Sequence, residues 1–550
     1  MKKSLKIILY TFLVSVLLVS CTDFLSPDSK KYTTDSQYGL KSPADSIYSM
    51  FGVFSQLQKL ADSYVLLGEL RGDLLDVSPT SDISLREINN FDITKDNIYV
   101  NIKNYYAVIN NCNYILHNLD TSFVDKGQKF KLREYAAIKA IRAWTFMQIA
   151  LNFKTTKYYE NPIITLADAE KTYPEYTITE LADVLIPDLE PLKDVTTPDL
   201  GYIDNYYSSF SYFPIRFILG DLYLWKGAYE NNPADYEKAA TNYRDLMYQD
   251  RIIVNKLYSS SWLPVNNAIS SSYYANWILS FSFNSGEVMT TITCPTQYGQ
   301  NFYLDSLNNQ SKIIPSAIAL SNWDNQTYYL NEASNAQGDL RKFGSIWYKS
   351  ISTVPTASNS YSGTAGTSTY VYKYKLYDQN VIVYRSSLLY LRYAEAVNRL
   401  QKPKLAFAVL KYGLNSTNMF NLKIIPASEK GNPTPAYMNF SDSRFNNNAG
   451  IRMRGLGNMD QDTTFYSFHR QIAMKDSILY VEDLIQKELA LETAFEGNRF
   501  HDLMRLTFRR INNGEGDASY LADKVAAKHI GNEAAIKARL MTTDNWYIKK

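Results

Sequence analysis

The chain has 550 residues, of which 45% are hydrophobic and 20% are charged, and its formal net charge is +2. This composition is that of a globular protein with a substantial core, and the near-neutral charge argues against a nucleic-acid partner. The three cysteines are too few for a disulfide framework or a cysteine-rich zinc site.

The N-terminus has the layout of a secretory signal. Three lysines within the first six residues precede an apolar run at 7–19, which is too short to span a bilayer. Cys21 follows an aliphatic and a small residue, a spacing that resembles the bacterial lipoprotein signal. We therefore expect residues 1–20 to be removed and Cys21 to carry a lipid anchor. The alternative is ordinary secretion with an incidental cysteine.

Much of the remaining chain is expected to be helical. Ser42–Asp45 resembles a capping box, and 132–151 has apolar residues at helical spacing. Residues 213–247 resemble a tetratricopeptide helix pair whose turn has been lengthened by several residues. A second, weaker pair is expected over 387–412, where Pro403 interrupts the helix.

The two helix pairs are far apart in the sequence, and the stretch between them differs in composition. It is rich in Ser, Thr, Asn and Tyr, and the short alternating runs at 277–281 and 370–374 predict a few short strands. We therefore predict one large, mainly helical domain, 21–550. Its helical scaffold, about 40–253 and 385–550, is split by a loop-rich insertion, about 254–380.

Six stretches resemble sequences of the SusD/RagB family of Bacteroidetes outer-membrane lipoproteins. The most specific is Val481–Leu506, which resembles the closing signature of that family. The others follow in the expected order and are Glu69–Val77, Tyr105–Leu116, Ala136–Phe153, Arg385–Leu400 and Gly450–Asn458. Together with the lipoprotein-like N-terminus, the resemblance covers essentially the whole chain.

The resemblance implies a tetratricopeptide-like helical scaffold with a loop-rich ligand face. It also implies a position above a SusC-like TonB-dependent outer-membrane transporter. Members of this family bind glycans in most cases and peptides in some, without chemical turnover. We therefore expect a surface-exposed outer-membrane lipoprotein that delivers oligosaccharides or polysaccharides to the transporter. The alternatives are a peptide-capturing RagB-like protein and a surface glycoside hydrolase.

Aromatic residues of the insertion are the first candidates for ligand contact. Flat rings can pack against the C–H faces of sugars, while amides and charged groups bond to hydroxyls. Four of the seven tryptophans lie there, although any single ring could instead pin a loop in the core; they are Trp262, Trp277, Trp323 and Trp347. The candidate ligand residues are Trp277, Trp323, Tyr328, Tyr329, Trp347, Asn322, Asp324, Asn325 and Gln326, with Arg71 and Asp73 from the first family-like stretch.

Acidic residues near the C-terminus raise the question of catalysis. Glu488, Glu492 and Glu496 recur every fourth residue, which places them along one face of a helix. Two carboxylates on one face cannot easily flank a polymeric sugar, as a glycosidase requires. Because Arg499 follows on the same segment, we predict that Glu488, Glu492, Glu496 and Arg499 form a structural ion network.

Other catalytic and cofactor motifs are missing from the sequence. The four histidines are scattered without zinc-ligand spacing, and there is no nucleophile elbow or phosphate-binding loop. We therefore expect no metal site and no cofactor. A single disulfide between Cys112 and Cys294 is left open.

Overall fold

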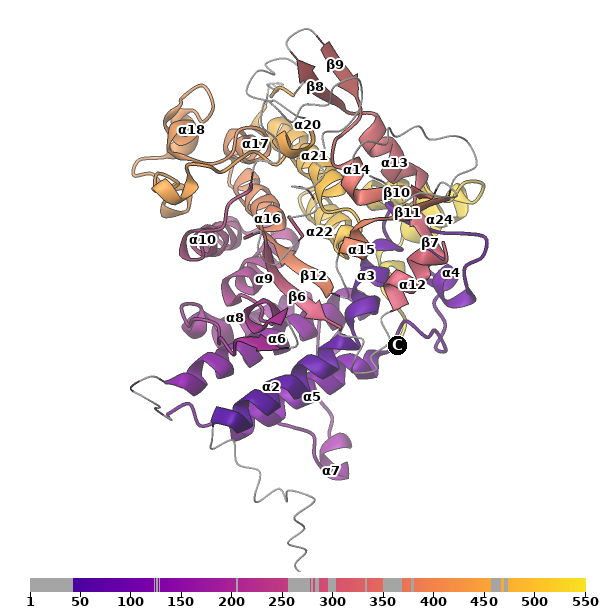
Figure 1. Cartoon of the computed structure of the whole chain (residues 1–550), viewed down its shortest axis with the longest axis vertical. Coiled ribbons are helices and arrows are strands. Elements are labelled where there is room, and N and C mark those ends of the chain that lie inside the picture. Colours follow the sequence, from indigo (N-terminus) through magenta and orange to yellow (C-terminus); the bar gives the residue numbers. More distant parts are fainter. Residues whose placement is uncertain are drawn as a thin grey trace, which may run out of the picture.

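The computed structural model is mainly helical (Figure 1). It describes residues 43–122, 124, 127, 129–203, 206–255, 277, 280–281, 286–294, 303–331, 334–349, 368–376, 380–456, 466–468 and 473–550. Cys21 and Trp262 lie outside these residues. Within them, no helix is both long enough and apolar enough to cross a bilayer.

The N-terminal part of the scaffold is a series of helices. They are α2 (Pro43–Gln58), α3 (Ala61–Glu69), α4 (Ile83–Asn90), α5 (Ile102–Asn118), α6 (Phe130–Phe153), α7 (Leu166–Ala169) and α8 (Ile178–Leu189). Local sequence fixes several of their ends. Asp82 caps α4 by accepting the N–H of Leu85, and Phe91 ends α4 in the left-handed conformation. Thr177 and Glu180 form a capping box at the start of α8.

Two helical hairpins lie side by side although the insertion separates them in the sequence. They are α9 (Ile215–Glu230) with α10 (Pro233–Gln249), and α16 (Ser386–Arg399) with α17 (Pro403–Lys411); α10 also packs against α16 (Figure 1). The predicted lengthening of the first turn is wrong. Helix α9 continues to Glu230, Asn231 then adopts the left-handed conformation, and Asn232 caps α10.

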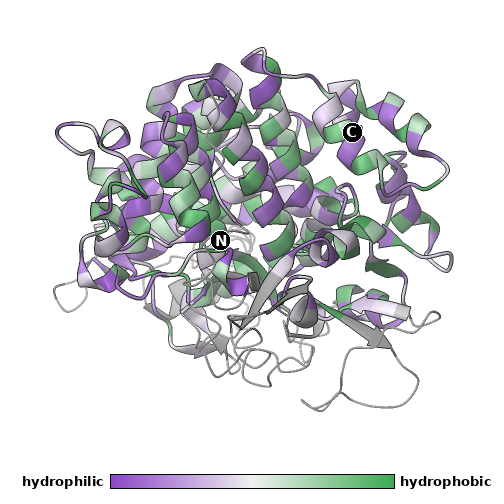
Figure 2. Cartoon of the chain, turned by 90° about the horizontal axis from the view of Figure 1, so that it is seen from above, coloured by the Kyte–Doolittle hydropathy of each residue, from purple (hydrophilic) through white to green (hydrophobic). Residues whose placement is uncertain are grey.

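Close packing in these hairpins depends on small residues. A Cβ atom at Gly220 would lie 2.3 Å from the ring of Tyr243, so α9 and α10 can approach this closely only with glycine there. Helix α16 is buried from Ser386 to Asn398, which is typical of a helix at the centre of a large domain. Hydrophilic and hydrophobic residues are mixed along the scaffold helices in Figure 2, as expected of helices with one face in the core.

The insertion contains short paired strands and short helices. The antiparallel pairs are β6 (Val288–Thr293) with β12 (Asn380–Arg385), β8 (Thr327–Asn331) with β9 (Ser334–Gln337), and β10 (Ile346–Lys349) with β11 (Ser368–Val371). A fourth pair, β1 (Leu75–Val77) with β7 (Ile313–Pro315), joins the insertion to the N-terminal scaffold. The helices of the insertion are α12 (Tyr303–Asn309), α13 (Ala317–Asp324), α14 (Lys342–Ser345) and α15 (Lys373–Leu376).

The runs at 277–281 and 370–374 were predicted to be strands, and the structure confirms this only for the start of the second run. Trp277 is helical and residues 280–281 form a turn, while the 370–374 run leaves β11 after Val371 and enters α15. Two further small pairs lie in the scaffold, β2 (Thr156–Lys157) with β3 (Glu175–Tyr176), and β4 (Tyr202–Ile203) with β5 (Tyr206–Tyr207).

The C-terminal part returns to the helical scaffold. Its helices are α18 (Ser416–Phe420), α19 (Ala427–Lys430), α20 (Met453–Leu456), α21 (Met474–Glu492), α22 (Arg499–Asn512), α23 (Ser519–Ala526) and α24 (Glu533–Leu540). Short 3-10 turns occur in both parts of the scaffold. In the N-terminal part they are η1 (Glu190–Leu192) and η2 (Ser208–Ser211), and in the C-terminal part η6 (Ala436–Met438), η7 (Ser443–Phe445) and η8 (Thr543–Trp546).

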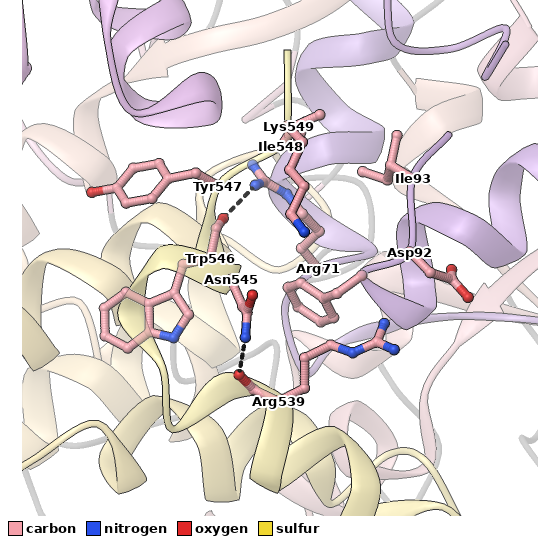
Figure 3. A pocket seen from close by; sticks show the side chains of 10 residues that line it. Arg71, Asp92, Ile93, Arg539, Asn545, Trp546, Tyr547, Ile548 and Lys549 are labelled. Carbon is pink, nitrogen blue, oxygen red and sulfur yellow. Dashed lines mark hydrogen bonds between the residues drawn. The ribbon is translucent and has the colours of Figure 1, made fainter. Parts of the chain in front are cut away.

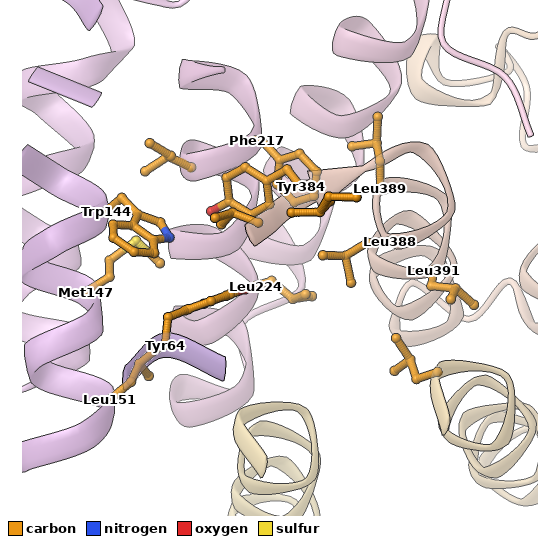
Figure 4. Close-up of a cluster of buried hydrophobic side chains, with 14 of the residues drawn as sticks. Tyr64, Trp144, Met147, Leu151, Phe217, Leu224, Tyr384, Leu388, Leu389 and Leu391 are labelled. Atoms are coloured by element: carbon orange, nitrogen blue, oxygen red, sulfur yellow. The ribbon is translucent and has the colours of Figure 1, made fainter. Parts of the chain in front are cut away.

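An aromatic cluster joins α3, α6 and α9 to β12 in the core (Figure 4). The rings of Phe217 on α9 and Tyr384 on β12 are stacked, with centroids 3.9 Å apart and an interplanar angle of 13°. Trp144 on α6 packs against Phe213 at 4.8 Å and against Tyr64 on α3 at 5.7 Å. Such aromatic pairs stabilise by about 1 kcal/mol beyond their buried area.

Candidate functional site

The acidic residues of α21 lie in a buried ion cluster. Arg341 Nη1 lies 3.0 Å from Glu488 and 3.1 Å from Glu492. Glu492 also contacts Arg385 at 2.9 Å and Arg454 at 3.1 Å, and all five side chains are buried. Because Arg341 belongs to the insertion and Glu488 and Glu492 to the scaffold, the cluster joins the two.

The other two predicted members of the network are placed differently from the prediction. Glu496 lies beyond the end of α21, so it does not continue the helical face, and it contacts Arg385 and Lys373, each at 2.7 Å. Arg499 pairs with Asp73 at 2.6 Å rather than with a glutamate. Helix α21 ends at Glu492 and α22 begins at Arg499, and Phe495 and Gly497 between them have positive φ, so Glu496 and Arg499 do not continue the face of Glu488 and Glu492.

The charge state of these acids differs from that of a glycosidase pair. Burial alone raises the pKa of Glu492, but Arg454, Arg385 and Arg341 outweigh it and hold the pKa well below its ordinary value. The pKa of Glu496 is also held low, by Arg385 and Lys373 against the effect of burial. A glycosidase needs one protonated acid that reaches its substrate, whereas these two carboxylates are ionised and buried.

Trp277 and Trp323, two of the expected ligand platforms, are core residues instead. Trp323 is fully buried, donates its Nε1–H to the carbonyl oxygen of Leu491 at 3.2 Å, and packs against Phe495. Trp277 is also fully buried, and a Cβ atom at Gly344 would lie 1.7 Å from its ring. Each indole fills space between the insertion and its neighbours, so neither offers a face to a ligand.

The polar candidates around Trp323 lie at the C-terminal end of α13. Asn322 and Gln326 are half-buried, while Asp324 and Asn325 are exposed. Gln326 accepts a hydrogen bond from Arg452 at 2.7 Å, and the carboxylate of Asp324 bonds to Lys342 at 2.5 Å. The side chains of Tyr328, Tyr329 and Trp347 on the neighbouring strands lie outside the described part of the chain.

The two candidates from the first family-like stretch are buried. Asp73 is ion-paired with Arg499, which outweighs burial and holds the pKa of Asp73 below its ordinary value. Arg71 is 1% exposed, and its Nε and Nη1 donate to the carbonyl oxygens of Leu67 at 2.8 Å and Trp546 at 3.0 Å. Asp73 therefore has a structural partner, whereas Arg71 lines a pocket.

This pocket lies between the loop after α4 and the C-terminal segment (Figure 3). Its volume is about 360 Å³, and its lining residues are Arg71, Phe91, Asp92, Ile93, Arg539, Asn545, Trp546, Tyr547, Ile548 and Lys549. A second pocket, of about 350 Å³, lies between α6, α9 and α10. Among the described residues, no group of three or more His, Cys, Asp or Glu side chains could hold a metal ion.

An exposed aromatic residue that the sequence analysis missed lies at the start of α12. Tyr303 is 47% exposed, and its ring meets that of Tyr99 edge-on at 6.4 Å. Asp62 accepts the backbone N–H of Tyr303 at 3.0 Å, which ties α12 to α3. The hydroxyl of Tyr99 donates to Asp82 at 3.2 Å, and Lys312 lies 4.0 Å from the same carboxylate.

Two exposed aliphatic residues are direct sequence neighbours of Asp82 and Tyr99. Ile83 follows Asp82 and is 70% exposed, and Ile98 precedes Tyr99 and is 72% exposed. We call the group Asp82, Ile83, Ile98, Tyr303 and Lys312 the Tyr303 surface. No local pattern separates Tyr303 from the other 44 tyrosines, because its exposure depends on Asp62 and Tyr99, which are distant in the sequence.

The two described cysteines do not form the disulfide that the sequence left open. Cys112 and Cys294 are both free thiols and both buried. Burial raises the pKa of Cys112 to about 12, so this thiol is protonated and unreactive at neutral pH.

No family model and no curated protein matches the chain by sequence. Solved structures are similar in fold. A SusD superfamily protein from Bacteroides thetaiotaomicron is 13% identical with a TM-score of 0.55, covering 88% of this chain and 98% of that chain. The B. fragilis protein NanU is 17% identical with a TM-score of 0.54, covering 90% and 95%. Surface glycan-binding protein A from Bacteroides uniformis is 15% identical with a TM-score of 0.52, covering 92% and 96%.

These similarities extend over nearly the full length of both chains, so they concern the whole architecture rather than one helical hairpin. The prediction of a mainly helical, tetratricopeptide-like scaffold is confirmed. The protein therefore has the SusD-like fold that its sequence motifs predicted.

Proposed function

We propose that the protein is a SusD-like surface lipoprotein that binds glycans and delivers them, chemically unchanged, to a SusC-like TonB-dependent transporter. The observation that carries this proposal is the near full-length similarity in fold to SusD superfamily proteins, one of them named a surface glycan-binding protein. The lipoprotein-like sequence at Cys21 supports attachment to a membrane through a lipid anchor. The outer membrane and the cell exterior, as the place where the protein acts, are part of the proposal.

Within the described residues, the Tyr303 surface is the best candidate for glycan contact. A half-exposed tyrosine ring offers an apolar face to a sugar. Ile83 and Ile98, which are next to Asp82 and Tyr99 in the sequence, are exposed aliphatic residues. Asp82 and Lys312 supply an acceptor and a donor for hydroxyl groups at the same place. The rings of Tyr328, Tyr329 and Trp347 remain candidates for further stacking.

The affinity expected of such a surface is modest. One stacked ring contributes about 1 kcal/mol, and a few hydrogen bonds add to it after ordering costs are subtracted. A dissociation constant of roughly micromolar to millimolar follows. Such affinity suffices when the transporter lies directly beneath, because proximity raises the effective concentration of the captured glycan.

The test is a glycan-array screen of the purified protein, followed by calorimetry with the best ligand. Tyr303→Ala should weaken binding by about 1–3 kcal/mol without changing the melting temperature, since the ring is at the surface. Tyr202→Ala is the matched control, because Tyr202 is a 75% exposed tyrosine on the β4–β5 hairpin, which contributes no residue to the Tyr303 surface. If Tyr303→Ala binds like the control, the site assignment is wrong.

Two other results would replace the proposal itself. Binding of peptides and of no glycan would favour a peptide-capturing protein. That alternative has some support, because each sheet in the described part of the chain has only two strands and could accept a peptide strand at an edge. Shortened glycans after incubation with contaminant-free protein would show a hydrolase instead.

A further inference from the structure

The pocket of Figure 3 contains a buried positive charge without a counter-ion. Every other buried arginine among the described residues forms an ion pair with an aspartate or glutamate. Arg71 is as deeply buried as these, yet no carboxylate of the described residues lies within ion-pair distance of its guanidinium. Burying a charge without a partner costs several kcal/mol.

The guanidinium of Arg71 is held in a fixed position. It lies over the ring of Phe500, 4.4 Å from the centroid, and its Nη2 contacts Asn152 and His501. With the bonds to Leu67 and Trp546, these contacts use at most four of its five N–H groups. One Nη1 hydrogen is therefore left for an oxygen atom of a ligand in the pocket.

The protonation states around Arg71 leave its charge uncompensated. Burial lowers the pKa of Arg71 to about 9, so the side chain is still protonated at pH 7. Burial also lowers the pKa of His501 well below its ordinary value, so that the imidazole is neutral. The neighbouring groups thus orient the guanidinium without neutralising it.

The rim of the pocket is positively charged, like Arg71 inside it. Arg539 and Lys549 are exposed cations at its edge, and Asp92 is the one acid among the lining residues. Phe91, the residue that ends α4, lines the wall with its ring. The volume of about 360 Å³ is near the lower limit of ligand pockets, so it suits one sugar ring rather than a polymer.

We propose that this pocket binds a monosaccharide-sized ligand through a carboxylate, which makes an acidic sugar its ligand class. The carboxylate would take the place of the missing counter-ion of Arg71 and be attracted by Arg539 and Lys549. A metal cation would be repelled by three positive charges, and a neutral sugar could accept hydrogen bonds from them but would lack the charge attraction that a carboxylate adds. The pocket shares no residue with the Tyr303 surface, so this proposal does not depend on glycan capture there.

The test is calorimetry of the purified full-length protein with glucuronate and with glucose at low salt. A charge-assisted hydrogen bond should make glucuronate bind about tenfold or more tightly than glucose. Equal binding of the two sugars would overturn the proposal. Equal binding of glucuronate and the dipeptide Ala-Ala would assign the site to peptide carboxylates, and equal binding of inorganic phosphate would assign it to anions in general; both results overturn the acidic-sugar class.

Variants locate the site. Lys549→Glu should weaken glucuronate binding severalfold, whereas Lys487→Glu, which makes the same charge change at an exposed position of α21, should not. Arg71→Lys keeps the charge but loses the planar fork, and it should also weaken binding. Because Lys549 is exposed, its variant stays informative even if Arg71→Lys fails to fold. Equal effects of Lys549→Glu and Lys487→Glu would contradict the assignment.

Discussion

Asp73 and Arg499 form a buried bidentate ion pair, at 2.6 and 2.8 Å, although 426 residues separate them in the chain. Four residues before Asp73, at the end of α3, the carboxylate of Glu69 accepts the backbone N–H groups of Phe495 at 3.1 Å and Gly497 at 2.8 Å. The first and the last family-like stretches are therefore in direct contact. Together they fasten the end of α3 to the turn between α21 and α22.

Removing the cation of this pair should destabilise the protein strongly. Arg499→Met leaves Asp73 buried without its partner, which is expected to lower the free energy of unfolding by about 3–5 kcal/mol. Urea denaturation monitored by circular dichroism measures this change. Lys171→Met, which breaks the exposed pair with Asp168, is the control and should cost less than about 1 kcal/mol. Equal unfolding midpoints for the two variants would contradict a structural role of Arg499.

The contribution of Glu492 should depend on pH. Its folded-state pKa is below its ordinary value, so the stability that it contributes is fully present above the unfolded pKa of about 4.3. That stability is lost as the pH falls through the lower, folded-state pKa. Glu492→Gln should therefore be destabilised by roughly 3 kcal/mol at pH 7, and its difference from the wild type should shrink below about pH 4.

Urea denaturation of both proteins between pH 3 and pH 7 checks this prediction. Glu170→Gln, at an exposed position, is the control and should differ little from the wild type at any pH. A constant difference between Glu492→Gln and the wild type across this range would contradict the proposed ion pairing. Loss of ligand binding without loss of stability would show instead that Glu492 belongs to a binding site.

Replacing Trp323 should affect stability rather than ligand contact. Its indole is fully buried, so Trp323→Ala leaves a cavity and is expected to cost about 3–5 kcal/mol. The melting temperature of this variant should fall, while that of Tyr303→Ala should not. An unchanged melting temperature together with weaker glycan binding would restore Trp323 as a surface platform.

The anchor prediction concerns Cys21. Cys21→Ala should yield protein that is released from the membrane or left unprocessed, because buried acyl chains supply the membrane affinity. Membrane fractionation and metabolic lipid labelling measure the effect. Ser20→Ala, which keeps a small residue before the cysteine, is the matched control and should remain attached. Lipid labelling of the Cys21→Ala protein at the wild-type level would rule out this anchor.

The sequence by itself determined the helical architecture of the protein. Helical periodicity located α6 and both hairpins, since the pattern of apolar residues in a helix reflects the face that it buries. The ordered family-like stretches also predicted the SusD-like fold. Each of these signals lies within a few turns of chain, where neighbouring residues alone decide the local structure.

Only the tertiary structure decided which side chains are available to a ligand. Trp323 looked like a surface ring in a polar segment, yet its N–H meets Leu491, 168 residues away. Arg499 was expected to pair with a nearby glutamate but meets Asp73, and Tyr303 is displayed because Asp62 holds the start of α12. Burial and ion pairing depend on which distant segment covers a residue, and local sequence patterns do not contain that information.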